Sequence, residues 1–182
     1  DLYDAFAEKM VAKMAEQEPG APEDDLLLGP LSSKTAAERL EAQIEAAISA
    51  GATPLLRGAA PHGDGGAHVG TTVLADIAPT NPAYQQEFFG PVASLYRVSS
   101  EDEAIEVANA TPFGLGSYVY TTDEEQASRL ADRIDAGMVF VNAVLADEAG
   151  LPFGGVKRSG TGREMGVLGI EEFLNKKVVR LP

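Results

Sequence analysis

The sequence predicts an α/β fold in which a mostly parallel sheet is flanked by helices. The main indication is an alternation of segments in the second half of the chain: strand patterns at 92–98, 117–120 and 138–142 are separated by helix patterns that begin near Ser100 and Thr122. Strands separated by single helices usually lie parallel, because a return in the same direction needs a crossover. A chain of 182 residues also suffices for one ordinary domain with a real hydrophobic core.

Two helices are expected in the first half. Residues 1–17 carry an apolar residue every four positions, which predicts a helix with one buried face formed by Leu2, Phe6, Met10 and Met14. Ser32 or Ser33 can cap a second helix that runs to about Ala50 and ends at Gly51. Its apolar face comprises Leu40, Ile44 and Ile48.

Strands are expected at 53–57 and 71–77, on either side of a glycine-rich loop. The two helices of the second half have clear starts. Ser100 with Glu103, and Thr122 with Glu125, both have the capping-box spacing, in which side chains satisfy the free amides of a first turn.

Charge and composition exclude several classes of function. The chain holds 14 basic and 28 acidic residues, a net charge of -14 that repels nucleic acid and anionic lipid. No apolar run approaches the roughly 18 to 20 residues that span a bilayer, and no signal peptide is visible. We therefore expect a soluble, cytoplasmic protein with neither a nucleic-acid nor a membrane partner.

The sequence contains no cysteine, and therefore no disulfide, thiolate metal site or thiol nucleophile. His62, Asp64 and His68 lie in the glycine-rich loop, where nothing fixes metal ligands in place, so we expect no metal site. The chain opens inside a helix pattern without an initiator methionine, which suggests a piece of a longer protein.

Three stretches carry a family resemblance: Glu-Phe-Phe-Gly-Pro at 87–91, Asn-Ala-Thr-Pro-Phe-Gly-Leu at 109–115 and Pro-Phe-Gly-Gly-Val-Lys-Arg-Ser-Gly at 152–160. Together with Ala-Gly-Met-Val-Phe-Val-Asn at 136–142, and in this order, they resemble aldehyde dehydrogenases over essentially the whole chain. The resemblance implies the carboxy-terminal part of such an enzyme. Residues 1–166 would form a catalytic domain that lacks its upstream start, and residues 167–182 a tail and oligomerisation arm.

The resemblance implies that Glu87 holds the nicotinamide ribose of NAD or NADP, since a carboxylate can accept hydrogen bonds from both hydroxyls of a diol. It also implies that Phe89 lies against the nicotinamide, and that Phe153 and Asn142 belong to the aldehyde pocket. Taken alone, Glu87 would be read as an exposed charge, and Phe89 and Phe153 as core side chains.

In this family a cysteine thiolate attacks the aldehyde. The resemblance places that cysteine, the general base, the oxyanion asparagine and the pyrophosphate site upstream of this chain. The isolated chain is therefore expected to be inactive and to bind cofactor weakly or not at all. The resemblance also implies that the strand-like segment 176–181 joins a sheet across a subunit boundary, which predicts a homodimer or homotetramer for the full-length enzyme.

Within the family, residues 151–160 most resemble succinate-semialdehyde dehydrogenases. Two acidic residues nearby, Asp147 and Glu148, would favour a neutral aldehyde if they faced the pocket. Two alternatives stay open: a non-catalytic α/β module that binds a nucleotide or a subunit, and a parent enzyme that reduces activated acyl groups.

Overall fold

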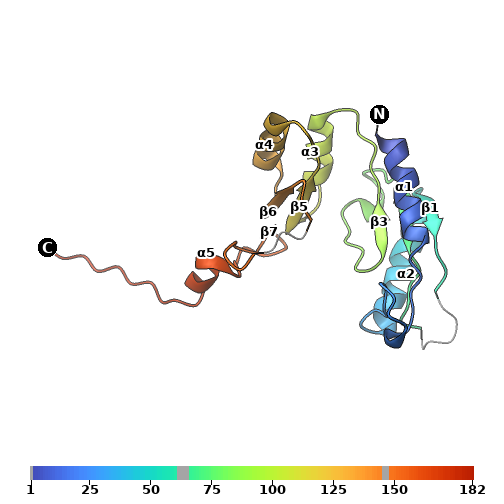
Figure 1. The fold of residues 1–182 in the computed structure, drawn as a ribbon, viewed down its shortest axis with the longest axis horizontal. Coiled ribbons are helices and arrows are strands. Elements are labelled where there is room, and N and C mark those ends of the chain that lie inside the picture. Colours follow the sequence, from blue (N-terminus) through green and yellow to red (C-terminus); the bar gives the residue numbers. More distant parts are fainter. Residues whose placement is uncertain (1, 61–65, 145–147) are drawn as a thin grey trace. The chain divides into compact units, whose positions relative to one another are not determined.

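The computed structural model describes residues 2–60, 66–144 and 148–182 (Figure 1). The chain forms two compact units, residues 1–99 and residues 100–182. The sequence predicts no boundary at this point, and the assignment of residues 1–166 to one catalytic domain stays a prediction. Each unit is described below by itself.

The first unit is built on a three-stranded sheet in the order β1-β2-β3. Its strands are β1 (Thr53–Arg57), β2 (Thr72–Ala75) and β3 (Val92–Ser94). Strand β1 runs antiparallel to β2, whereas β3 runs parallel to β2. The antiparallel pair is possible because no helix intervenes between β1 and β2, and a parallel return would need a crossover.

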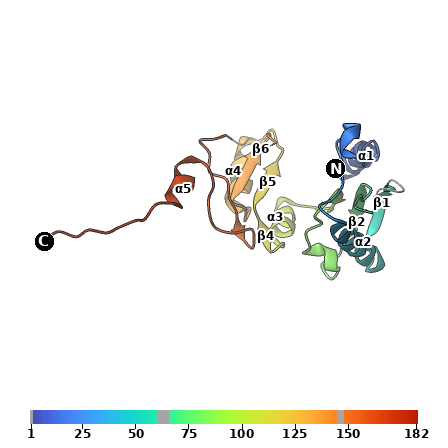
Figure 2. The same cartoon turned by 90° about the horizontal axis from the view of Figure 1, so that it is seen from below.

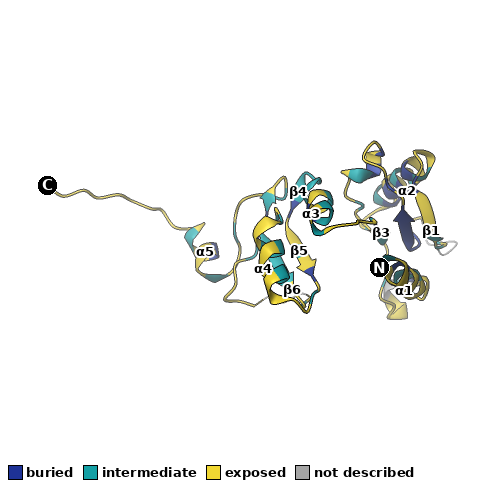
Figure 3. Ribbon diagram, turned by 90° about the horizontal axis from the view of Figure 1, so that it is seen from above, coloured by how far each residue is buried: buried dark blue, intermediate teal, exposed yellow. Residues whose placement is uncertain are grey.

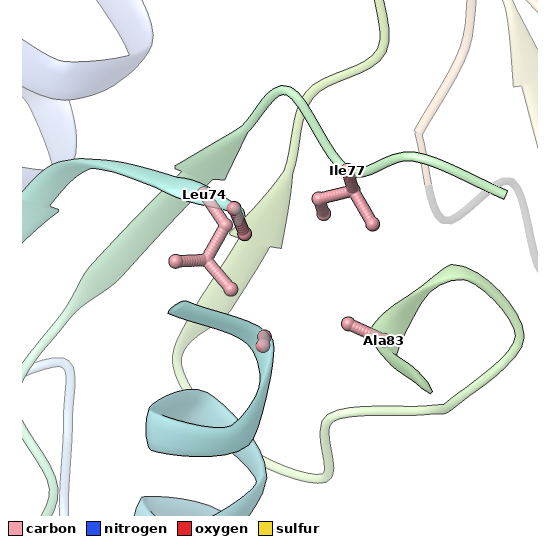
Figure 4. Packing of buried hydrophobic residues seen from close by; sticks show 5 residues of the cluster. Leu74, Ile77 and Ala83 are labelled. Atoms are coloured by element: carbon pink, nitrogen blue, oxygen red, sulfur yellow. The ribbon is translucent and has the colours of Figure 1, made fainter. Parts of the chain in front are cut away.

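Helices α1 (Tyr3–Ala15) and α2 (Lys34–Ser49) lie on either side of β1 and β2 (Figure 2). Neighbouring residues of a strand point to opposite faces, and β2 is buried on both. Val73 packs with Ala7 of α1, whereas Leu74 packs with Ala47 of α2. The second face continues beyond the strand, where Ile77 and Ala83 close the core (Figure 4). A short 3-10 helix, η2 (Pro82–Tyr84), carries Ala83; another, η1 (Pro22–Asp24), follows α1.

The second unit contains two small two-stranded sheets. Strands β5 (Gly116–Val119) and β6 (Met138–Val141) pair in parallel, with α4 (Glu124–Arg133) as the crossover between them. Strands β4 (Phe113–Gly114) and β7 (Val156–Lys157) pair antiparallel. Helix α3 (Glu101–Asn109) precedes these strands and α5 (Gly166–Glu171) follows them. Residues 172–182 are exposed (Figure 3).

The predicted α/β class is confirmed, but the strands do not form one sheet. Among the described residues, two pairings are parallel and two antiparallel. The strand pattern at 176–181 has no regular structure here. The strand arm therefore stays a prediction for an assembled enzyme, because a strand needs a partner to satisfy its backbone groups.

Both predicted caps of the serine type are present: Ser33 Oγ accepts from Ala36 N, and Ser100 Oγ accepts from Glu103 N, each at 3.1 Å. The predicted cap at Thr122 is wrong. Asp123 caps α4 instead, since its carboxylate accepts from the amides of Glu125 and Gln126. A carboxylate is at least as good an N-cap as a threonine hydroxyl, and it also suits the positive end of the helix dipole.

The predicted buried face of α1 is wrong at its start. Leu2 is 82% exposed and Phe6 53% exposed. A row of residues spaced by four drifts about 40° around the helix at each step, so the first members leave the face that Met10 and Met14 share. The residues that pack on the sheet are Tyr3, Ala7, Met10, Val11 and Met14.

No helix of the described residues is long and apolar enough to cross a membrane.

Candidate functional site

The segment with Glu87 and Phe89 lies in the first unit, between η2 and β3. Its alternate residues anchor it: Phe88 is half-buried and packs against the core, and Gly90 fits so tightly that a Cβ atom there would lie 2.3 Å from Cδ2 of Leu40. A side chain at position 90 would therefore force the buried side chain of Leu40 on α2 to shift. The anchors leave Glu87 exposed and Phe89 82% exposed.

Backbone hydrogen bonds hold the same segment. The amide of Gly90 donates to Phe88 O at 2.9 Å, and Thr72 N of β2 donates to Pro91 O at 2.9 Å. The side chain of Gln43 on α2 donates to the carbonyl of Glu87 at 3.4 Å. Glu87 is thus held through its backbone while its exposed carboxylate faces solvent, as a group that receives a ligand's hydroxyls must be.

Phe153 lies in the second unit and is half-buried. Its amide donates to Glu164 O at 2.8 Å and its carbonyl accepts from Glu164 N at 2.7 Å. Phe153 borders a cavity of about 190 Å³, together with uncharged residues that include Met138, Phe140 and Met165. The cavity suits the apolar part of a ligand, because a charge there would lose its hydration.

Gly154 and Gly155 pack so closely against neighbouring segments that neither position has room for a side chain. A Cβ atom on Gly154 would lie 2.3 Å from Gly162 O and 2.8 Å from Cδ of Arg163. A Cβ atom on Gly155 would lie 2.8 Å from Cβ of Ser159. The glycine pair therefore serves close backbone packing beside Phe153, a use of glycine distinct from the turn chemistry of a loop.

Asn142 directly follows β6 and has a left-handed conformation, with φ +53°. Its side-chain oxygen accepts from Thr121 N at 3.0 Å and its side-chain nitrogen donates to Thr121 O at 2.8 Å. The amide thus joins the end of β6 to the turn before α4. It is not among the residues that border the Phe153 cavity, and a role in the aldehyde pocket stays a prediction.

The structure places the four predicted residues in two pairs. Glu87 and Phe89 share one exposed segment of the first unit, and Asn142 and Phe153 belong to the second unit. There Phe153 borders a cavity with residues of β6, whereas Asn142 follows β6 and does not border that cavity. Two residues beside Phe153 were not predicted, Arg163 and Met165. The only signal for them in the sequence is their place just after two closely spaced glycines, Gly160 and Gly162, which by themselves suggest only a loop.

The acidic pair near the pocket and the histidine loop are only partly described. Asp147, His62 and Asp64 lie outside the described residues, whereas Glu148 is exposed. His68 is buried, with Nε2 2.8 Å from Gly20 O, an interaction that fixes its ring within the fold. Within residues 2–60, 66–144 and 148–182 no cluster of three potential metal ligands occurs.

Comparison with known proteins places this geometry in a family. The profile of the aldehyde dehydrogenase family matches residues 1–179. The chain is 49% identical over 181 residues to a succinate-semialdehyde dehydrogenase [NADP(+)] of Deinococcus radiodurans, covering 99% of this chain and 38% of that protein. It is 45% identical to a protein of the same description from Mycobacterium leprae, covering 98% of this chain and 39% of that protein.

Solved structures agree. A succinic semialdehyde dehydrogenase of Streptococcus pyogenes in complex with NADP+ matches with a TM-score of 0.90 and 38% identity, over 100% of this chain and 40% of that one. A Mycobacterium tuberculosis aldehyde dehydrogenase complexed with NAD+ matches with a TM-score of 0.91 and 35% identity, over 100% of this chain and 38% of that one. The chain spans about two fifths of the length of the curated relatives it matches. It belongs to the aldehyde dehydrogenase family.

Proposed function

We propose that the complete protein, meaning these residues joined to the remainder of its relatives' length, is an NADP-dependent dehydrogenase that oxidises succinate semialdehyde to the dicarboxylic acid. The observation that carries this proposal is the 49% identity, over nearly the whole chain, to a relative described by that activity and cofactor. Use of NAD, and oxidation of other small aldehydes, are the neighbouring possibilities that the same assay separates.

Glu87 and Phe89 would hold the cofactor. The exposed carboxylate of Glu87 suits the two hydroxyls of a ribose, each of which donates one hydrogen bond. The exposed ring of Phe89 offers a flat apolar surface to a nicotinamide. Two side chains bury only a small part of a dinucleotide, so we expect the isolated chain to bind it weakly or not at all.

Phe153 would form one wall of the aldehyde pocket, with Asn142 nearby. The dinucleotide supplies the hydride acceptor when it is bound. A thiolate is the nucleophile in this family and the chain has no cysteine, so we expect no turnover from these residues alone.

The test is the formation of NADPH by the complete protein with succinate semialdehyde, compared with butanal, which has the same chain length and no carboxylate. We expect a higher kcat/KM for succinate semialdehyde and with NADP. A preference for butanal would contradict the substrate, and a preference for NAD the cofactor. Failure with every aldehyde, in a protein that binds a nucleotide or a subunit, would favour the non-catalytic module.

The role of Glu87 is tested separately by Glu87→Gln in the complete protein. The amide keeps the size but loses the charge, and we expect the KM for NADP to rise about tenfold, the scale of one hydrogen bond to a charged group. Glu8→Gln, an exposed change on α1, is the control and should leave that KM unchanged. An unchanged KM in Glu87→Gln would remove this residue from the cofactor site.

We also propose that the complete protein is a cytoplasmic homodimer or homotetramer in which the tail 176–181 adds a strand to another subunit. Val178 and Leu181 are 95% and 78% exposed, and a strand without a partner leaves backbone groups that can pair with another chain. Removal of residues 176–182 should lower the molar mass measured by light scattering. An unchanged mass would exclude the tail as the assembly element.

A further inference from the structure

Arg163 makes an unusual set of contacts in the second unit. Its Nη1 atom donates to three carbonyl oxygens: Gly155 at 2.8 Å, Gly162 at 3.0 Å and Thr161 at 3.1 Å. A guanidinium nitrogen carries two hydrogens, so the three carbonyls share them. Hydrogen bonds from a charged donor are roughly twice as strong as those between neutral groups.

One of these contacts, the hydrogen bond to Gly155, holds the end of the segment 153–155 that lies away from Phe153. Glu164, the next residue after Arg163, pairs with the backbone of Phe153 on both its amide and its carbonyl. Arg163 itself holds Gly155, two residues further along. Residues 153–155 are thus fixed at one end by a backbone pair and at the other by a side chain.

Gly154, the residue between these two anchors, packs directly on the same arginine. A Cβ atom on Gly154 would lie 2.8 Å from Cδ and 3.0 Å from Nη1 of Arg163. The arginine amide in turn donates to Glu172 Oε1 at 3.3 Å, which joins it to the end of α5. Arg163 therefore has both a fixed place and a direct mechanical connection to the backbone that bears the Phe153 ring.

We propose that Arg163 is a positioning residue for the aldehyde, acting through residues 153–155 on the ring of Phe153. This inference rests on the proposed function. A displacement of about 1 Å in a group that orients a substrate can cost on the order of a hundredfold in rate. A lysine could not replace the arginine here, because its ammonium group is a compact charge and lacks the planar array of donors of the guanidinium group.

The experiment uses Arg163→Ala in the complete protein. We expect kcat/KM for the aldehyde to fall about tenfold to a hundredfold. The KM for NADP should stay unchanged, because residues 87–89, which would hold the cofactor, do not take part in the hydrogen bonds of Arg163, here called the Arg163 clamp. Added guanidinium should restore part of the loss, since the arginine is only partly buried and the ion can reach the vacated carbonyls. A defect that does not arise from the lost guanidinium contacts would not respond to guanidinium, and a general loss of structure would also raise the KM for NADP.

Arg158→Ala is the matched control. Arg158 is exposed, belongs to the same loop, and places its guanidinium 5.7 Å from the ring centre of Phe113 rather than on the clamp. It should retain the wild-type kcat/KM and show no response to guanidinium. If Arg163→Ala fails to fold, Arg163→Lys takes its place and should show the same loss for the aldehyde without a change for NADP.

Three results would overturn the proposal: unchanged kcat/KM in a folded Arg163 variant, an equal loss in Arg158→Ala, or an equal rise in the KM for NADP. The assay of the wild-type protein distinguishes a failure of the positioning role of Arg163 from a failure of the proposed function. A wild-type protein that oxidises no aldehyde contradicts both, because there is then no aldehyde to position. An active wild type with an unaffected Arg163 variant contradicts the positioning role alone.

Discussion

Gly137 and Gly154 pack backbone against backbone. A Cβ atom on Gly137 would lie 2.1 Å from the carbonyl oxygen of Gly154 and 2.7 Å from Cα of Gly155. Gly137 directly precedes β6, so this contact sets how closely the Phe153 segment approaches the strand that borders its cavity.

Gly137→Ala should therefore destabilise the chain. The added methyl group meets backbone on the other side, which cannot move aside as a flexible side chain can, and we expect a loss of about 1–3 kcal/mol, typical of overpacking. Denaturant unfolding of the chain measures the loss. Gly162→Ala is the control, because a Cβ atom there has nothing within 4 Å, and it should change the free energy of unfolding by less than about 0.5 kcal/mol.

Asn142 offers a second test. Asn142→Gly keeps the left-handed backbone but removes both hydrogen bonds to Thr121, which should cost about 1–3 kcal/mol. Asn142→Ala also places a Cβ atom in a left-handed conformation, φ +53°, and should cost roughly 1 kcal/mol more. Thermal or denaturant unfolding of both variants gives the order. An alanine variant at least as stable as the glycine variant would show that the backbone conformation does not contribute.

Local signals in the sequence predicted the elements well. Strand β1 has the predicted bounds, Ser33 and Ser100 cap their helices, and Gly51 ends α2 with φ +101°. These features depend on a few neighbouring residues, which is why periodicity and capping rules find them. The exposure of Leu2 and Phe6 depends on which face meets the sheet, and the spacing by four alone does not determine that.

The candidate site was predictable only as far as the motifs reach. They point to Glu87, Phe89, Phe153 and Asn142, and the structure adds a local reason for the exposure of the first two, the anchoring of Phe88 and Gly90 on α2. The Arg163 clamp was missed, because its hydrogen bond to Gly155 depends on a turn that brings residues 153 and 164 together. Patterns of period 2 or 3.6 carry no information about such a turn.

Glu101 predicts a dependence of stability on pH in the second unit. Hydrogen bonds from Arg129 and then Gln126 hold the pKa of the Glu101 carboxyl below its ordinary value of 4.5. Because the folded-state pKa is depressed, the stabilisation is present above the ordinary pKa and is lost as pH falls through the lower folded value. Glu101→Gln should therefore lower the melting temperature at neutral pH, and the difference from the wild type should shrink below pH 4.5.

The control for this effect is Glu106→Gln, which removes the same charge from the exposed side of α3. Its melting temperature should follow the wild type across the same pH range. A Glu101→Gln difference that stays constant down to the acid limit would mean that the amide loses packing rather than an ion pair with Arg129.

Met165 carries the clearest backbone strain of the second unit. Its φ of 61° and ψ of 168° lie in a region that is essentially reserved for glycine. The conformation is imposed by its neighbours, since Glu164 is paired with Phe153, and Gly166 N donates to Ala149 O at 3.0 Å.

Met165→Gly and Met165→Ala both remove the thioether side chain of Met165, which is 38% exposed, but only glycine relieves the strain. The glycine variant should therefore be more stable than the alanine variant by about 1–3 kcal/mol in denaturant unfolding. At Leu168, within α5, the same pair should show the reverse order by about 1 kcal/mol, because alanine is the better helix former. An alanine variant more stable than glycine at both positions would show that position 165 is not strained.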